Sequence, residues 1–103
     1  MKRMVLAVLI MLAMAMQAQA DTLKGNYFAC RTAQLFDEMM TLQVRGDERG
    51  MAYLLGHGCI VTRPGLGVSV LGSPSLGTVK VRVYADDGDS MIMWTNVENV
   101  QKD

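Results

Sequence analysis

Two cysteines and a histidine are the residues best placed to do chemistry in this chain. Cys59 lies two positions after His57, and Cys30 lies about thirty residues earlier. Two thiols and one imidazole could hold a metal ion or take part in redox chemistry. However, a closed zinc site needs a fourth ligand, and the chain has no second histidine. If the cysteines are instead bonded to each other, no thiolate remains as a nucleophile.

Carboxylates offer a second possible chemistry, but their spacing does not favour it. Asp37 and Glu38 are adjacent in a predicted helix, so their side chains project about 100° apart, which suits a solvated edge better than an acid and base pair. Three aspartates within residues 86–89 surround a glycine. They lack the distant bidentate carboxylate of a dedicated calcium loop. We therefore predict no catalytic residues, no metal and no cofactor.

The composition excludes several classes of protein. The chain has 103 residues, 50% of them hydrophobic, and a formal net charge of zero. It is too short for a multi-domain enzyme, and it lacks the positive field expected of a basic nucleic-acid binder. The hydrophobic residues are also unevenly distributed, because 16 of the first 20 residues are apolar.

The N-terminal segment has the features of a secretory signal peptide. Two basic residues precede an apolar run over residues 4–16, and Ala18-Gln19-Ala20 supplies small residues for cleavage. Thirteen helical residues would reach only about 20 Å, short of the roughly 30 Å hydrocarbon core. We therefore predict a signal peptide at 1–20 and a single small domain at 21–103. We expect a periplasmic or secreted protein with no stable membrane insertion after cleavage.

Export favours a disulfide between Cys30 and Cys59, since disulfides form and persist in oxidising compartments. Closing a loop of about thirty residues should stabilise a small domain by about 3 to 4 kcal/mol in the chain-entropy model. A metal-binding or redox site using Cys30, His57 and Cys59 is the alternative.

The segment between the cysteines has helical periodicity. Apolar residues recur at spacings of three and four from Leu35 to Leu42, with Thr32 as a possible N-cap and Gly46 as a stop. Asp47 can cap a second, shorter helix. The sequence therefore predicts an antiparallel helical hairpin over about residues 32–56, with the two cysteines at its open base.

After Cys59 the pattern changes to short β-branched or aromatic runs separated by glycine and proline, over about residues 59–101. We expect strands near 60–61, 68–71, 79–84 and 91–95, with Gly72-Ser73-Pro74 among the separators. A further strand is expected near residues 26–29.

Asp87-Gly88 is a strong signal for a hairpin turn. With a two-residue loop, Val83 would pair with Ile92 and Val81 with Trp94. Four other side chains would then share the opposite face. This predicted binding surface consists of Arg82, Tyr84, Met91 and Met93, unless the helical hairpin covers it.

The strand order and residue types of residues 59–101 resemble the bacterial SH3-like domains of exported proteins. The resemblance rests on Val68-Ser69-Val70-Leu71-Gly72, on Val79-Lys80-Val81-Arg82-Val83 and on a last strand with Trp94. It implies a small β-barrel. Two departures, a missing Arg-Ser-Gly-Pro segment and Met93-Trp94-Thr95 in place of Gly-Trp, mean that no cell-wall ligand is carried over.

Together these patterns predict an α+β domain, in which a small SH3-like β-barrel or bent antiparallel sheet carries a disulfide-clamped helical hairpin near its N-terminus. The expected function is that of an exported, non-enzymatic binding module that recognises a protein or a cell-envelope component. An inhibitor or immunity-type protein is the narrower form of this hypothesis. We expect no nucleic-acid partner.

Overall fold

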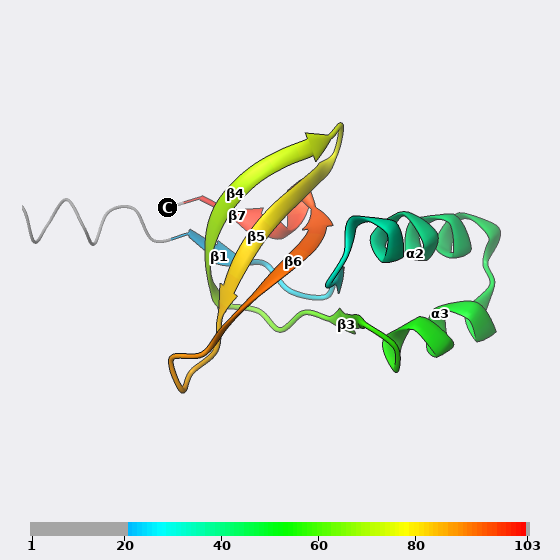
Figure 1. Ribbon diagram of the computed structural model, residues 1–103, viewed down its shortest axis with the longest axis horizontal. Coiled ribbons are helices and arrows are strands. Elements are labelled where there is room, and N and C mark those ends of the chain that lie inside the picture. The colour runs from blue at the N-terminus through cyan, green and yellow to red at the C-terminus, as the bar shows by residue number, and fades with distance from the viewer. Residues whose placement is uncertain (1–20, 103) are drawn as a thin grey trace, which may run out of the picture.

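The computed structural model describes residues 21–102, so the predicted signal peptide at 1–20 lies outside the described residues. Within this range the chain forms one antiparallel sheet of seven strands and a pair of helices. The two helices lie side by side and extend away from the sheet (Figure 1). The domain is therefore α+β, as the sequence predicts.

The elements follow one another in the order β1, β2, α2, α3, β3, β4, β5, β6, η1, β7. Their bounds are Asp21–Leu23 (β1), Phe28–Cys30 (β2), Ala33–Arg45 (α2), Glu48–Leu55 (α3), Cys59–Val61 (β3), Gly67–Ser75 (β4), Thr78–Tyr84 (β5), Ser90–Asn96 (β6), Val97–Asn99 (the 3-10 turn η1) and Val100–Gln101 (β7).

The predicted helical hairpin is confirmed, together with its caps. The N–H of Leu35 donates to Thr32 Oγ1 at the start of α2, and the N–H of Gly50 donates to Asp47 Oδ1 at the start of α3. Between the helices Gly46 adopts a left-handed conformation with φ 69°. Glycine takes this conformation at little cost, which ends α2 and turns the chain into α3.

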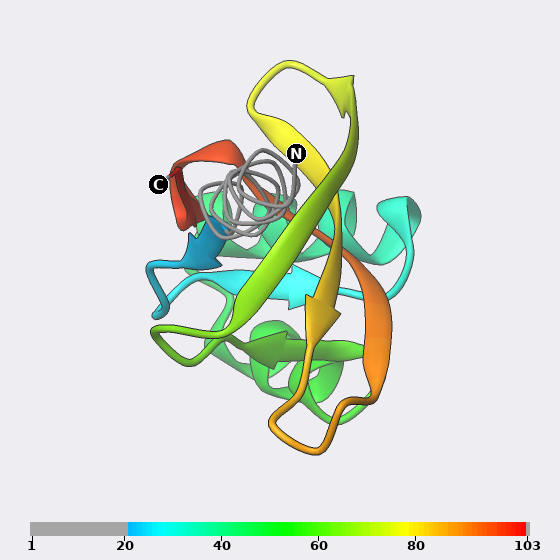
Figure 2. The same cartoon turned by 90° about the vertical axis from the view of Figure 1, so that its left-hand side faces the viewer.

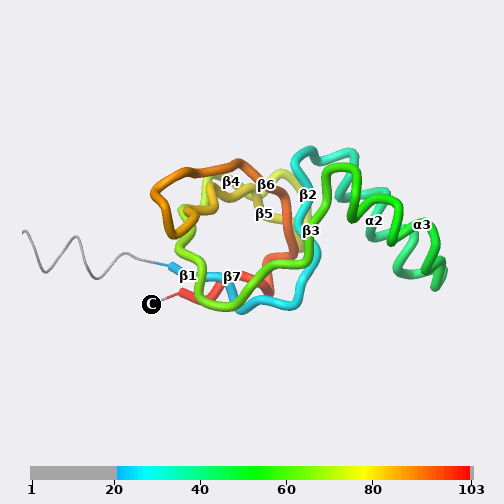
Figure 3. The backbone as a smooth tube through the Cα atoms, turned by 90° about the horizontal axis from the view of Figure 1, so that it is seen from below, coloured from blue at the N-terminus to red at the C-terminus, as the bar shows by residue number. Residues whose placement is uncertain are grey.

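The sheet is strongly curved, and in the view of Figure 3 its strands surround a common interior. The strand order is β3-β2-β6-β5-β4-β1-β7, and no pairing within residues 21–102 joins the two edge strands. The prediction of a bent antiparallel sheet is confirmed, whereas a barrel closed by backbone hydrogen bonds is wrong. The edges β3 and β7 have only three and two residues, and each pairs with a single neighbouring strand.

Strand β4 is longer than expected. Gly72, Ser73 and Pro74 were expected to separate two strands, but β4 continues through them with register shifts on either side of Gly72. Bulges accommodate a proline inside a strand because the bulged residue need not donate to the ladder. The turn falls instead at Leu76-Gly77, at the tip of the long, twisted β4–β5 hairpin that Figure 2 shows.

Strands β1 and β7 were not predicted. Each is short, and each depends on distant pairing, β1 with β4 and β7 with β1.

Two apolar clusters form the core. The sheet cluster lies on the inner face of the sheet and consists of Leu23, Ala29, Val68, Val79, Val81 and Met93. The hairpin cluster lies between the helices and the sheet and consists of Cys30, Phe36, Met39, Leu54 and Cys59, with Trp94 among the partly buried residues packed against it. Strands β2 and β6 contribute alternate residues to the two clusters, as expected for strands buried on both faces.

A buried polar network lies near the gap between the sheet edges. The side chain of Asn99 accepts from the N–H of Gly25 at 3.0 Å and donates to the hydroxyls of Thr62 and Thr95, both at 3.1 Å. The hydroxyl of Thr95 donates in turn to the carbonyl of Phe28 at 2.7 Å. Asn99 thus ties the last turn of the chain to the β1–β2 loop, to β6 and to the segment after β3.

Candidate functional site

The predicted disulfide between Cys30 and Cys59 is confirmed. The two residues are direct partners in the β2–β3 ladder, with their Cα atoms 4.0 Å apart, and both are buried. The bond joins the chain just before α2 to the chain just after α3. It therefore closes the base of the helical hairpin.

His57, the third member of the alternative metal or redox site, lies on the surface. Its ring stacks on Tyr53 with the centroids 4.0 Å apart, and its Nδ1 lies 2.7 Å from the carbonyl oxygen of Tyr53. The sulfur atoms of Cys30 and Cys59 are bonded to each other, so neither can act as a thiolate ligand in this state. No metal-ligating cluster occurs among the residues that the structure describes.

The β5–β6 hairpin has a register one residue away from the expected one. Val83 pairs with Met91 and Val81 pairs with Met93. The cause is the loop: the N–H of Ala85 bonds to the carbonyl of Asp89, and Gly88, at φ 92°, donates its N–H to the carbonyl of Ala85. The loop therefore contains three residues instead of two, an arrangement in which a glycine in the left-handed region forms a bulge.

The shift divides the predicted binding surface between two faces, because a slip of one residue exchanges the faces of a strand. Arg82 and Tyr84 pair with Ile92 and Ser90 on the outer face, whereas Met91 and Met93 lie on the inner face opposite valines. The expectation that the four residues share one face is therefore wrong. Their role in binding stays a prediction.

The outer face is partly exposed. Tyr84 is 40% exposed and its hydroxyl lies 2.9 Å from Ser69 Oγ. Arg82 donates to Ser90 Oγ at 3.3 Å. The helices reach the opposite end of this face, where Trp94 packs against the hairpin cluster and the Asn96 side chain meets Met40. The helical hairpin thus covers the Trp94 end of this face, and Tyr84 stays open to solvent.

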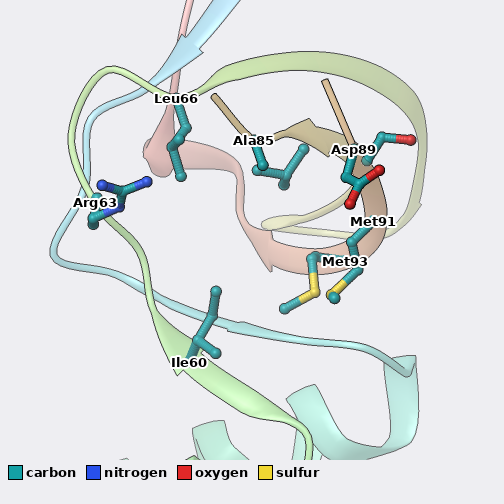
Figure 4. A pocket seen from close by; sticks show the side chains of 9 residues that line it. Ile60, Arg63, Leu66, Ala85, Asp89, Met91 and Met93 are labelled. Carbon is teal, nitrogen blue, oxygen red and sulfur yellow. The ribbon is translucent and has the colours of Figure 1, made fainter. Parts of the chain in front are cut away.

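An apolar pocket opens beside the inner face, where the two methionines lie (Figure 4). Its volume is about 210 Å³. We call it the mouth pocket, and its lining residues come from β3, the segment after it, and the β5–β6 hairpin: Ile60, Arg63, Leu66, Val83, Ala85, Asp89, Ser90, Met91 and Met93. Met93 belongs to the sheet cluster, and Leu66 and Val83 pack on that cluster. The pocket is thus an open extension of the core.

The side chains that line the pocket range from fully buried to well exposed. Met93 is 2% exposed, whereas Met91 is 59% exposed and Ile60 is 45% exposed. Single exposed apolar residues are common on protein surfaces, but here they border one hollow that continues into the core. This combination of a buried floor and an exposed apolar rim suits the uptake of an apolar group.

Charged groups lie at the edge of the mouth pocket. Arg63 and Asp89 belong to its lining, on opposite sides of it in Figure 4. An exposed ion pair of 3.8 Å joins Arg63 to Asp86 in the β5–β6 loop. In the same loop, Asp87 Oδ1 accepts from the N–H of Asp89. The pocket therefore has an apolar floor and a charged edge, with carboxylates on the side of the loop.

The sequence did not reveal this pocket, although it singled out Met91 and Met93. Its lining comes from segments that are not adjacent in the chain, and the two methionines face it only because the loop has three residues. The only hint in the sequence was that Met91 and Met93 occupy alternate positions of one strand and therefore share a face. Methionine is common at adaptable binding surfaces.

Comparisons of the chain with protein-family models, with curated proteins and with solved structures found no match. Along residues 21–102, no helix is both long and apolar enough to cross a membrane. The fold by itself does not define a function, since one fold hosts many functions. The mouth pocket is therefore the feature on which a function can be based.

Proposed function

We propose that this protein is an exported, non-enzymatic binding module that recognises a protein or a cell-envelope component. The mouth pocket is the observation that carries the proposal. It is lined mainly by aliphatic and thioether groups, and its exposed members, Met91 and Ile60, are available to a partner. An inhibitor or immunity-type protein is the narrower form of the same proposal.

The scaffold supports this function because the β3 side of the pocket is tied to the rest of the fold. Cys30 and Cys59 crosslink β2 to β3, the strand that carries Ile60, and Asn99 fixes the segment that follows β3. A preorganised surface loses little conformational entropy when it binds. The disulfide is also compatible with an oxidising compartment outside the cytoplasm.

The test is a pull-down from periplasmic or culture-medium extract with three forms of the oxidised protein: wild type, Met91→Ser and Arg82→Ala. Met91→Ser alters the pocket at an exposed position, whereas Arg82→Ala alters the outer face. We expect a partner that wild type and Arg82→Ala retain and that Met91→Ser loses.

Loss of the partner only with Arg82→Ala, or no specific partner at all, would contradict the proposed role of the pocket. Val44→Ser is a matched control, because Val44 is an exposed apolar residue on α2, outside the mouth pocket. It should leave partner capture unchanged.

A further inference from the structure

The size of the mouth pocket limits what can occupy it. Ligand pockets for whole small molecules usually measure about 300 to 1,000 Å³. The mouth pocket, at about 210 Å³, is smaller. An apolar cavity of about 150 Å³ can hold benzene, so the mouth pocket has room for one apolar side chain. Its methionines can adjust to different shapes.

The charges at the edge indicate what should flank that side chain. Of the three aspartates in the β5–β6 loop, Asp89 lines the pocket, Asp86 is paired with Arg63, which also lines it, and Asp87 lies between the two in the chain. Three carboxylates and one guanidinium leave an excess of negative charge on the loop side. A partner with lysine or arginine beside its apolar side chain would complement this edge, and an acidic flank would be repelled.

We infer that the mouth pocket binds a protein segment in which an apolar side chain is flanked by basic residues, the apolar group entering between Met91 and Ile60 and a basic group facing the aspartates of the β5–β6 loop. This inference rests on the proposed function and specifies the chemistry of its partner.

A second copy of the chain is the main competing occupant. Leu76, at the tip of the β4–β5 hairpin, is fully exposed and could enter the mouth pocket of another molecule. Its neighbours from Ser73 to Thr78 carry no charge. Such a tip would not use the charged edge of the pocket, so the charges favour a basic partner.

The experiment uses the oxidised protein recovered after export, with ¹³C-labelled methionine methyl groups observed by NMR. Methyl shifts detect the weak binding expected of short probes. The probes are three capped peptides, Gly-Lys-Leu-Lys-Gly, Gly-Glu-Leu-Glu-Gly and Gly-Lys-Ser-Lys-Gly. We expect the first alone to shift the methyls of Met91 and Met93, while Met39, buried in the hairpin cluster, stays unchanged. Added salt should weaken this binding, because exposed charges are screened.

Two variants form a matched pair for the role of charge. Asp89→Asn removes a carboxylate at the pocket, and Asp37→Asn removes an exposed carboxylate on α2. We expect Asp89→Asn to weaken binding of Gly-Lys-Leu-Lys-Gly about two- to fivefold, the range of one exposed ion pair. Asp37→Asn should have no effect, although the net charge changes equally. Met91→Ser should abolish the shifts.

The outcomes separate this inference from the proposed function. Equal binding of the acidic and basic leucine peptides would overturn the basic flank and leave the binding module intact. Methyl shifts that depend on protein concentration without peptide would identify a second copy as the occupant and overturn the inference. If no peptide shifts the methyls while extract still yields a Met91-dependent partner, the inference fails and the proposed function stands. If both experiments are negative, both fail.

Discussion

Strands β2 and β6 carry a different apolar cluster on each face. On the inner face, the sheet cluster is made of aliphatic residues and Met93, drawn from strands that hydrogen bonds hold in register. On the other face, the hairpin cluster is centred on Phe36 and the disulfide. Backbone pairing links the strands that carry the sheet cluster, whereas the helices join the hairpin cluster through side-chain packing and through the Cys30–Cys59 bond at their base.

The difference explains where a pocket can form. The helices cover their cluster, so its aromatic centre is sealed and Phe36 is only 1% exposed. At the β5–β6 end of the sheet, β3 and the segment after it do not close over the inner face, and part of the sheet cluster stays open as the mouth pocket. The curved sheet therefore leaves part of its cluster open at this end, whereas the helical hairpin seals the cluster that it covers.

Replacing Phe36 with alanine should have the largest effect on stability. Phe36 is among the largest fully buried side chains. Its loss leaves a cavity, and the free energy of unfolding should fall by about 3 to 5 kcal/mol. Urea unfolding measures the loss, with Val44→Ala as the control on the exposed side of the same helix. Amide exchange should accelerate in α2 before it does in β5; equal acceleration would mean that the two clusters unfold as one unit.

Removing the disulfide should have the next largest effect. The variant Cys30→Ala with Cys59→Ala opens a loop that spans 29 positions, for which the chain-entropy model gives a loss of about 3 to 4 kcal/mol. This loss arises mainly in the unfolded chain, in contrast to that of Phe36→Ala. Urea unfolding of the oxidised and variant proteins tests it. A difference below about 1 kcal/mol would show that packing alone closes the helical hairpin.

Asn99→Ala tests the sheet side of the comparison. The substitution leaves the N–H of Gly25 and the hydroxyl of Thr62 without their bonds to this side chain. Unsatisfied buried groups cost about 1 to 3 kcal/mol. Thr62→Val, similar in shape and lacking one hydroxyl, should cost less. Urea unfolding of the two variants measures the difference. Equal losses in the free energy of unfolding would contradict a central role for Asn99 in linking the segments beside β3 and β7.

The helical hairpin could be predicted because its determinants are local. Thr32, Gly46 and Asp47 act on residues within four positions, so spacing alone places both helices. The disulfide was predicted from the expected export of the chain and from the position of the cysteines at the ends of that hairpin.

The pocket could not be predicted because it depends on whether the β5–β6 loop has two residues or three. Asp87-Gly88 suits a two-residue or a three-residue loop, and each choice places Met91 on a different face. Strands β1 and β7 lack a local pattern of their own, since both are held by distant partners. Val81 and Val83 were predicted to lie on the face of β5 opposite Arg82 and Tyr84, and they do; only their partners in β6 differ.

The smallest expected effect concerns the contact between the two regions. Lys80 lies on β5 in the sheet, and its Nζ lies 5.3 Å from the ring centroid of Trp94, a residue that packs against the hairpin cluster. Partly exposed cation–π pairs contribute about 0.5 to 1 kcal/mol. Lys80→Met keeps an unbranched side chain of similar length and removes the ammonium group. The free energy of unfolding, measured in urea, should therefore fall by about that amount. Lys102→Met, near the C-terminus, controls for the change in net charge. If Lys80→Met has no effect in the wild type but a full effect in Phe36→Ala, the ammonium group matters only when the hairpin cluster is loosened, and the two regions are coupled through Trp94.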